Sequence, residues 1–313
     1  MRKKVVEINH LEKGYKENKA VNDLNFEVYE GEILGLLGPN GAGKSTTISI
    51  LSTILKKDSG NIRILGKNLE TDIAYIKAHM GIVPQDIAIY EDITAYRNVA
   101  FFASLYGIKK SELKSRVEGA LEFVGLLDKK DDKPKTFSGG MKRRLNIACA
   151  IAHNPTILIL DEPTVGIDPQ SRNHILSSIL KLKQAGTTVI YTTHYMEEVA
   201  EIADRIVIMD NGKKIAEGTV TELLEKYKNT RKYILHIDGV KEYDCTSIKT
   251  IKGIQKVVVK EDLVEISLDK NCDNFNEIIS ELVKKDLRIH HMETEEGNLE
   301  MIFLDLTGKK LRD

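Results

Sequence analysis

A short glycine-rich segment constrains the fold of this 313-residue chain more than any other feature. The segment 38–45, Gly-Pro-Asn-Gly-Ala-Gly-Lys-Ser, fits the pattern GxxxxGK[ST]. It follows the apolar run from Ile33 to Leu37 and leads into a helical pattern from Thr46 to Leu55. This order of strand, loop and helix predicts an α/β fold built around a largely parallel sheet.

The residue types in this segment are suited to holding phosphate. Glycines let backbone N–H groups converge on phosphate oxygens, and the helix start at Lys44 adds unpaired amides and the positive end of the helix dipole. We expect Lys44 to neutralise the β- and γ-phosphates of ATP and the Ser45 hydroxyl to ligate Mg2+. The predicted ATP-binding residues of the loop are Gly38, Pro39, Asn40, Gly41, Ala42, Gly43, Lys44, Ser45 and Thr46.

A second apolar run, Ile157 to Leu160, ends in the acidic pair Asp161 and Glu162. Such a run is expected of a buried parallel strand whose carboxyl end faces the ligand crevice. There Asp161 can approach Mg2+ from a second side, and Glu162 can accept a proton from, or orient, an attacking water. Two acids after a strand are by themselves more typical of a solvated turn, but the phosphate loop upstream favours the functional interpretation.

A second helix start of phosphate-binding type lies at residues 137–141, Phe-Ser-Gly-Gly-Met. With this segment the sequence resembles the nucleotide-binding subunits of ABC transporters, whose signature LSGGQ appears here with Phe for Leu and Met for Gln. Five motifs in the family's order cover residues 1 to about 220. The Met variant, followed by Lys-Arg-Arg-Leu, is similar to the drug- and antibiotic-export branch of that family.

The resemblance implies further ATP-binding residues: Ser138, Gly139 and Gly140 in the signature, Tyr15 as the aromatic that stacks on adenine, and Gln85 as a sensor of Mg2+ and water. An aromatic face suits a base and an amide oxygen suits a hard ion. The residue types alone would equally place Tyr15 half-buried in the core and Gln85 on the surface.

The resemblance also assigns a switch histidine and an inter-subunit contact. His194 follows the expected strand Thr188 to Thr193 and would contact the γ-phosphate. Asp168 matches the family's inter-subunit loop, and a capping role beside Pro169 remains compatible with that assignment. The predicted catalytic residues are Glu162, His194 and Lys44, and the predicted Mg2+ ligands are Ser45, Gln85 and Asp161.

In the family, two such domains meet head to tail and clamp ATP between the phosphate loop of one and the signature of the other. One copy of each motif implies a homodimer, or a heterodimer with a second ABC ATPase. ATP binding would close the dimer and hydrolysis would release it. This opening and closing would be coupled to a membrane-spanning permease subunit, which would dock on the helical insertion around Ile87 to Tyr106. We therefore expect a cytoplasmic protein that is peripheral on the cytoplasmic face of the cell membrane.

Along the chain we expect a P-loop NTPase core of the ABC ATPase type at residues 1–227, with a helical subdomain at about 86–155. Residues 228–313 read as a small α+β accessory or regulatory domain. It has strands near 233–237, 256–259, 263–268 and 287–292, a helix capped by Asp273, and a second helix near Leu299 to Leu306. The segment Asn298 to Gly308 is similar to a closing motif of the export branch, with a role in regulating the dimer or partner assembly.

Composition narrows the remaining alternatives. Lys and Arg number 46 against 47 Asp and Glu, so bulk charge does not favour nucleic acid as a partner. The alternative function, a soluble ABC-type ATPase clamp acting on nucleic acid or ribosomes, normally brings paired cassettes, a coiled-coil insert or zinc modules, which the sequence does not show. A binding switch without turnover is disfavoured by Glu162 and His194.

Smaller expectations concern location and individual side chains. Three widely spaced cysteines fit a reducing cytosol, and the longest charge-free apolar stretch, residues 145–160, contains polar residues and a proline, which predicts no membrane-spanning helix. We expect Arg143 and Arg144 on a solvated face, and Cys149 packed as a small apolar side chain.

Overall fold

The computed structural model describes residues 2–16, 18–227, 230–269, 272, 274–295 and 299–307. Contacts divide this part of the chain into two compact units, which meet in sequence between Val220 and Thr221. Helix α8, Val220–Tyr227, begins at the last residue of the first unit. The domain boundary expected from the sequence, between residues 227 and 228, lies at the end of this helix and stays a prediction.

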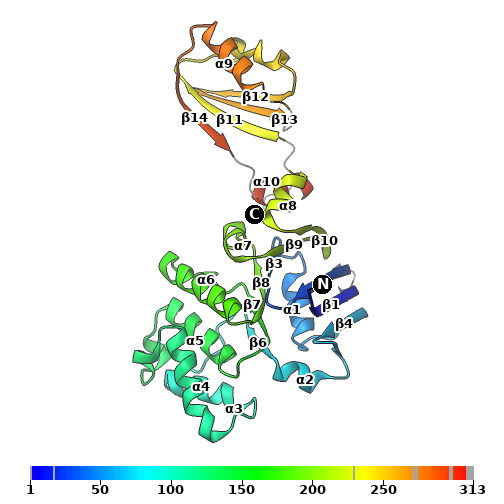
Figure 1. Ribbon diagram of the computed structural model, residues 1–313, viewed down its shortest axis with the longest axis vertical. Coiled ribbons are helices and arrows are strands. Elements are labelled where there is room, and N and C mark those ends of the chain that lie inside the picture. Colours follow the sequence, from blue (N-terminus) through cyan, green and yellow to red (C-terminus); the bar gives the residue numbers. More distant parts are fainter. Residues whose placement is uncertain are drawn as a thin grey trace. The chain divides into compact units, whose positions relative to one another are not determined.

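A six-stranded sheet forms the centre of the first unit (Figure 1). In spatial order it consists of β10 Lys213–Gly218, β9 Arg205–Asp210, β3 Ile33–Leu37, β8 Thr188–Thr193, β7 Ile157–Asp161 and β6 Met80–Val83. All neighbouring strands are parallel except β10, which is antiparallel to β9. Every residue of β3, β7 and β8 is buried, as expected for apolar strands covered on both faces. The α/β class predicted from the phosphate loop is therefore confirmed.

The first unit also contains an antiparallel sheet that the sequence analysis missed. Its strands, in spatial order, are β2 Asn18–Tyr29, β1 Lys4–Tyr15, β4 Ser59–Ile64 and β5 Lys67–Asn68. Alternate residues of β2, among them Leu24, Phe26 and Val28, are buried in one core with apolar side chains of helix α1, Lys44–Leu51, and of the parallel sheet. The short helix α2, Ile73–Ala78, connects this sheet to β6.

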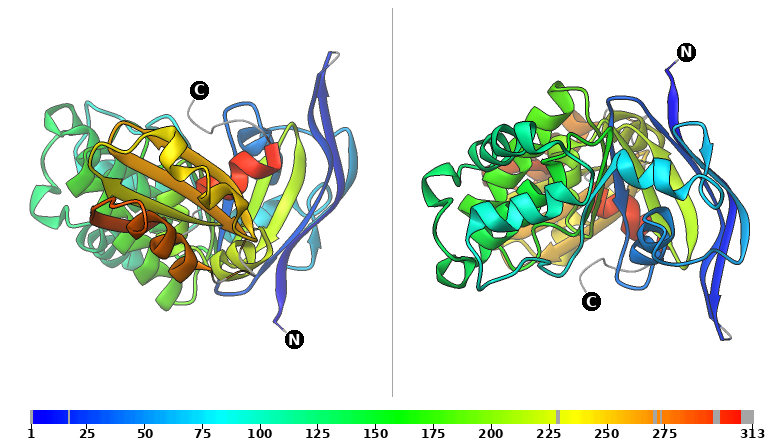
Figure 2. Two further views of the ribbon diagram at one scale, coloured as in Figure 1. Left: turned by 90° about the horizontal axis from the view of Figure 1, so that it is seen from above. Right: turned by 90° about the horizontal axis from the view of Figure 1, so that it is seen from below.

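Three mutually packed helices lie within the expected helical subdomain: α3 Ala95–Ser104, α4 Lys110–Phe123 and α5 Gly139–Ile151. In the first unit they and the antiparallel sheet lie on opposite sides of the parallel strands (Figure 2). Ser138 caps helix α5, because its hydroxyl accepts a hydrogen bond from the Met141 N–H at 3.2 Å. The helices α6, Pro169–Gln184, and α7, Met196–Ile202, follow β7 and β8.

The second unit is built on an antiparallel sheet in the order β12 Ile254–Lys260, β13 Leu263–Asp269, β11 Thr230–Ile237 and β14 Ile289–Glu295. Helix α9, Phe275–Val283, packs its buried residues Ile278 and Leu282 into the core of this sheet (Figure 1). Helix α10, Leu299–Thr307, is the last described element. The expected helix cap Asp273, and Asn298 and Gly308 of the closing motif, lie outside the described residues.

No helix within the described ranges has the length and apolar character that crossing a bilayer requires.

Candidate functional site

The phosphate loop lies between β3 and α1 and borders a cavity of about 200 Å³. Residues 39–46 line this cavity together with Ala20, Gln85 and Glu162. Gly43 stands directly before α1 with φ of 99°, and a Cβ atom there would lie 2.3 Å from the Ala20 carbonyl oxygen. Only glycine fits this backbone conformation and this contact, so the loop depends on Gly43 for its shape.

Lys44 is almost completely buried beneath the loop, with 4% of its surface exposed. Its Nζ donates hydrogen bonds to the carbonyl oxygens of Gly38 at 2.7 Å and Pro39 at 3.2 Å, and lies 3.3 Å from Oε1 of Glu162. Burial lowers the pKa of Lys44, and the charge of Glu162 opposes that change. The ammonium group is thus held in place at the loop, where phosphate oxygens would meet it.

Asp161 is the last residue of β7 and is buried. Its Oδ1 accepts a hydrogen bond from the Thr192 hydroxyl at 2.5 Å and one from the Ser45 hydroxyl at 3.5 Å. The Gln85 side chain, although exposed, lines the same cavity. The Ser45 hydroxyl, the Asp161 carboxylate and the Gln85 amide thus lie at the loop. Their oxygen atoms are suitable ligands for a hard divalent cation such as Mg2+.

Glu162 is buried and lies between two basic groups. Its Oε1 faces Lys44, and its Oε2 lies 3.0 Å from Nδ1 of His194, directly after β8. The residue adopts a left-handed backbone with φ of 46°, and its N–H donates to the carbonyl and hydroxyl oxygens of Thr192. A strained backbone held by a neighbouring strand aims this carboxylate at the loop.

Two helix starts outside this cluster carry the other predicted residues. Asp168 caps α6, because its Oδ1 accepts a hydrogen bond from the Ser171 N–H at 2.9 Å, and hydrogen bonds from Ser171 lower the pKa of Asp168. The start of α6 packs on the start of α5 so closely that a Cβ atom at Gly140 would lie 2.1 Å from Oγ of Ser171. Gly139, by contrast, has only Ile167 within 4 Å of such an atom.

Tyr15, at the end of β1, is 51% exposed, with Nζ of Lys13 5.9 Å from the centre of its ring. It is not among the residues that line the cavity at the loop. Half of the Tyr15 surface is thus exposed, and stacking on adenine stays a prediction.

The expectation of a solvated Arg143 is wrong. This side chain is 3% exposed, and its guanidinium donates to the carbonyl oxygens of Pro84, at 2.6 Å, and Gln85. Burial lowers the pKa of Arg143. A signal was present in the sequence, because Ile147 and Ala150, four and seven residues on, place Arg143 on the apolar face of α5.

Arg144 is only partly buried, and it donates to the carbonyl oxygens of Val124 at 3.0 Å and Gly125 at 3.3 Å. The expectation of a solvated side chain is therefore wrong here too, in part. Cys149 is buried on α5, which confirms the prediction of a small apolar side chain.

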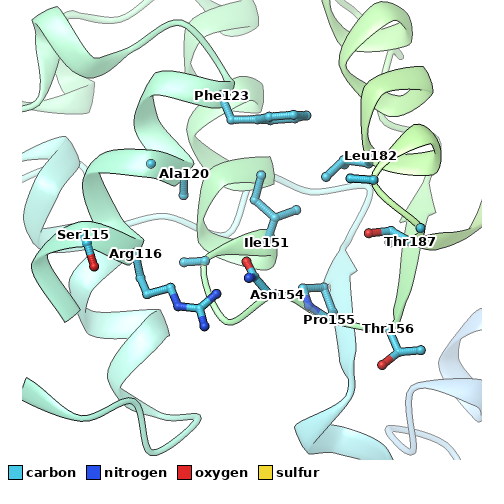
Figure 3. A pocket seen from close by; sticks show the side chains of 14 residues that line it. Ser115, Arg116, Ala120, Phe123, Ile151, Asn154, Pro155, Thr156, Leu182 and Thr187 are labelled. Carbon is cyan, nitrogen blue, oxygen red and sulfur yellow. The ribbon is translucent and has the colours of Figure 1, made fainter. Parts of the chain in front are cut away.

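A larger cavity, about 470 Å³, lies between α4 and the carboxyl ends of α5 and α6 (Figure 3). Thr156 and Thr187, which precede β7 and β8, place it at the amino ends of the parallel strands. The phosphate loop follows the carboxyl end of β3, so this cavity lies at the opposite edge of the sheet and contains none of the predicted site residues. The loop, the two strand-end acids and His194 instead define a P-loop nucleotide hydrolase.

Comparisons with known proteins agree with this class. A family model described as ABC transporter matches residues 21–165. The linearmycin resistance ATP-binding protein LnrL of Bacillus subtilis (strain 168) is 43% identical over 314 residues, which span 99% of this chain and 100% of that protein. The daunorubicin/doxorubicin resistance ATP-binding protein DrrA of Streptomyces peucetius is 34% identical, over 99% of this chain and 94% of that protein.

Solved structures show the same likeness. The ATP binding subunit of an ABC transporter matches with a TM-score of 0.66 and 29% identity, covering 72% of this chain and 93% of that one. A dimeric ATP-binding cassette in a post-hydrolysis state, bound to ADP and phosphate, matches with a TM-score of 0.63 and 27% identity, over 68% of this chain and 98% of that one.

The chain therefore belongs to the ATP-binding proteins of ABC transporters, and it is an ATP-binding, ATP-hydrolysing subunit similar to those of exporters. The resemblance inferred from the sequence motifs is confirmed.

Proposed function

We propose that this subunit powers an ABC exporter by closing as a dimer around ATP and by transmitting that closure to a separate membrane-spanning permease. The observation that carries the proposal is the convergence of Lys44, Glu162 and His194 at the phosphate loop. Such a cluster suits hydrolysis of a terminal phosphate, because phosphoryl transfer depends mainly on positioning and on stabilisation of charge.

In the proposed mechanism the loop amides and Lys44 bind the β- and γ-phosphates. Ser45, Asp161 and Gln85 would hold Mg2+, which supplies charge stabilisation at the phosphates when bound. Glu162 accepts the proton of the attacking water. His194 holds the Glu162 carboxylate through its Nδ1 and would contact the γ-phosphate through another edge of its ring.

The second half of each site would come from a partner subunit, either a second copy or a related ABC ATPase. Ser138, Gly139 and Gly140 present the unpaired amides of α5, and the capped Asp168 turn lies beside them. These groups would bind the γ-phosphate side of the ATP held by the partner's loop, so ATP would close the dimer and hydrolysis would open it.

The permease would dock on an apolar groove of about 500 Å³ in the first unit. Ile54, 79% exposed, and Leu105, 66% exposed, line it together with Phe102 and Tyr106. Apolar side chains exposed in one groove favour a protein partner. Export as the direction of transport is supported by the two relatives named for resistance to linearmycin and to daunorubicin/doxorubicin. A peripheral position on the cytoplasmic face of the membrane would follow from docking on the permease.

Substitution of Glu162 tests the hydrolytic part of the proposal. We expect Glu162→Gln to lower turnover by roughly 100-fold or more, as for loss of a general base, while ATP binding persists and a stable ATP-bound dimer accumulates. Turnover by Glu162→Gln at the rate of the parent chain would remove Glu162 from this role.

Affinity capture tests the transport part. The tagged chain, taken from detergent-solubilised membranes of its native cell, should retain a stoichiometric multi-span protein. Ile54→Glu, which adds one negative charge, should release that protein, whereas Lys114→Glu, a larger charge change on the exposed face of α4, should not. Recovery of ribosomes or DNA in its place would support the alternative, a soluble ATPase clamp.

A further inference from the structure

An acidic side chain outside all the predicted motifs is completely buried beside the candidate site. Glu198 lies in the first turn of α7 with 0% of its surface exposed. Its Oε2 accepts hydrogen bonds from the Tyr191 hydroxyl at 2.8 Å and the Thr193 hydroxyl at 3.1 Å. Burying a carboxylate costs several kcal/mol unless charges and hydrogen bonds compensate it, so a buried acid of this kind needs a structural or functional reason.

The compensating charge comes from another helix. The Nε of Arg172, in the first turn of α6, forms an ion pair at 2.9 Å with Oε1 of Glu198. The same guanidinium lies 5.9 Å from the centre of the Tyr195 ring, measured from Cζ. Helices α6 and α7 are therefore joined through Arg172, which is 28% exposed and also lies 3.6 Å from Oε2 of Glu197. Oε2 of Glu198 is turned toward β8.

Each end of this pair is attached to a residue of the candidate site. On the β8 side, Thr193 accepts a hydrogen bond from the Tyr195 N–H at 2.9 Å, so the hydroxyl that Glu198 fixes closes the turn containing His194. On the α6 side, the Arg172 N–H donates to the Asp168 carbonyl at 2.9 Å in the capped turn that packs beside Gly140.

We infer that Glu198 is a positioning residue for ATP hydrolysis: it fixes the His194 turn through Thr193 and ties that turn, through Arg172, to the Asp168 turn at the start of α6. The inference rests on the proposed function, because that function gives His194 and Glu162 their roles. It adds that the γ-phosphate side of the chain's own site and the turn facing the partner's site are connected through the ion pair of Glu198 with Arg172.

Glu198→Gln separates the two connections. The amide oxygen of Gln can still accept from Tyr191 and Thr193, but its NH2 group then faces the Arg172 guanidinium, and two donors replace the ion pair. We expect kcat to fall by roughly 10-fold or more, since small displacements of catalytic groups carry such factors, while the affinity for ATP stays within about threefold.

Glu32→Gln is the matched control. Glu32 is another buried acid, 2% exposed, whose Oε1 lies 3.3 Å from an Arg205 nitrogen and accepts from the Tyr29 N–H, away from the loop. The Glu32→Gln substitution should leave kcat unchanged. The inference is overturned if Glu198→Gln keeps kcat within twofold of the parent, or if Glu32→Gln lowers kcat equally.

The combined effect of two substitutions on hydrolysis distinguishes a positioning role from a purely structural one. If Glu198 acts through His194, adding Glu198→Gln to His194→Ala should not lower single-turnover hydrolysis further. A second drop of the full size would overturn the inference. Should Glu198→Gln fail to fold, Arg172→Gln breaks the pair from the exposed end, and full kcat in that variant would overturn it as well.

The same assays separate this inference from the proposed function. An active Glu162→Gln variant would defeat the proposed function itself. An inactive Glu162→Gln variant together with a fully active Glu198→Gln variant would defeat only the role of Glu198.

Discussion

The contact between α5 and α6 allows a quantitative prediction about Gly140. An added Cβ would lie 2.4 Å from Cβ of Ser171, and two carbon atoms need about 3.6 Å, so the first turn of α6 must shift by about 1.2 Å. Overpacking of this kind costs about 1–3 kcal/mol, whereas Gly→Ala in a helix contributes about 0.5–1 kcal/mol. We therefore expect Gly140→Ala to lower the free energy of unfolding by about 1–2 kcal/mol.

The adjacent glycine provides the control. A Cβ atom at Gly139 would meet only Ile167, at 3.9 Å, so Gly139→Ala should stabilise the chain by about 0.4–1 kcal/mol. Urea unfolding followed by circular dichroism measures both, because the sequence contains no Trp for fluorescence. Gly139→Ala should thus raise the free energy of unfolding above that of the parent chain, and Gly140→Ala should lower it.

A compensating substitution makes the reasoning refutable. Ser171→Gly removes both clashing atoms, so the double variant Gly140→Ala/Ser171→Gly should be more stable than the sum of the single changes predicts, by about 1–2 kcal/mol. Additive single effects, or a Gly140→Ala variant as stable as Gly139→Ala, would show that the two helix starts do not pack as described.

Three further predictions concern buried polar groups. Arg143→Met should speed amide exchange at residues 85–90, because the carbonyls of Pro84 and Gln85 lose their donor, whereas Arg144→Met should not. Burial raises the pKa of the Cys149 thiol, so in the native chain a thiol reagent should modify the partly exposed Cys272 before Cys149. Burial lowers the pKa of His153 from 6.5 to about 4, so between these pH values the unfolded state binds more protons than the folded state. The contribution of His153 to the free energy of unfolding should therefore fall as the pH drops from about 6.5 to 4. His153→Phe should flatten that slope in urea unfolding at pH 7 and pH 5.

The sequence predicted those parts of the fold that are specified by local patterns. The apolar runs at Ile33 and Ile157 identified central strands because both faces of a parallel sheet are covered. The antiparallel sheet was missed for two reasons. Charged and polar residues interrupt the apolar, buried positions of β1, and the pairing of β1 with β4 joins segments far apart in the chain.

The candidate site was predictable where one motif supplies both the residues and their backbone. Lys44 and the loop are of this kind, and their geometry follows from the glycines. The role of Arg143 was not, because its acceptors are main-chain carbonyls of Pro84 and Gln85 and no pattern of side chains records them. The role of Glu198 was not predictable for a similar reason, because its partner Arg172 lies on a different helix.

The attachment of the phosphate loop to its neighbours has a practical consequence for labelling the protein. The β9–β10 turn is bound to the phosphate loop and to β2: the Gly212 N–H donates to the Ala42 carbonyl, and the Gly212 carbonyl accepts from the Asn22 N–H. An insertion at this turn would displace the loop. The β4–β5 turn at Gly66 has no atoms within 4 Å of an added Cβ, so a peptide tag or a fluorescent probe belongs there.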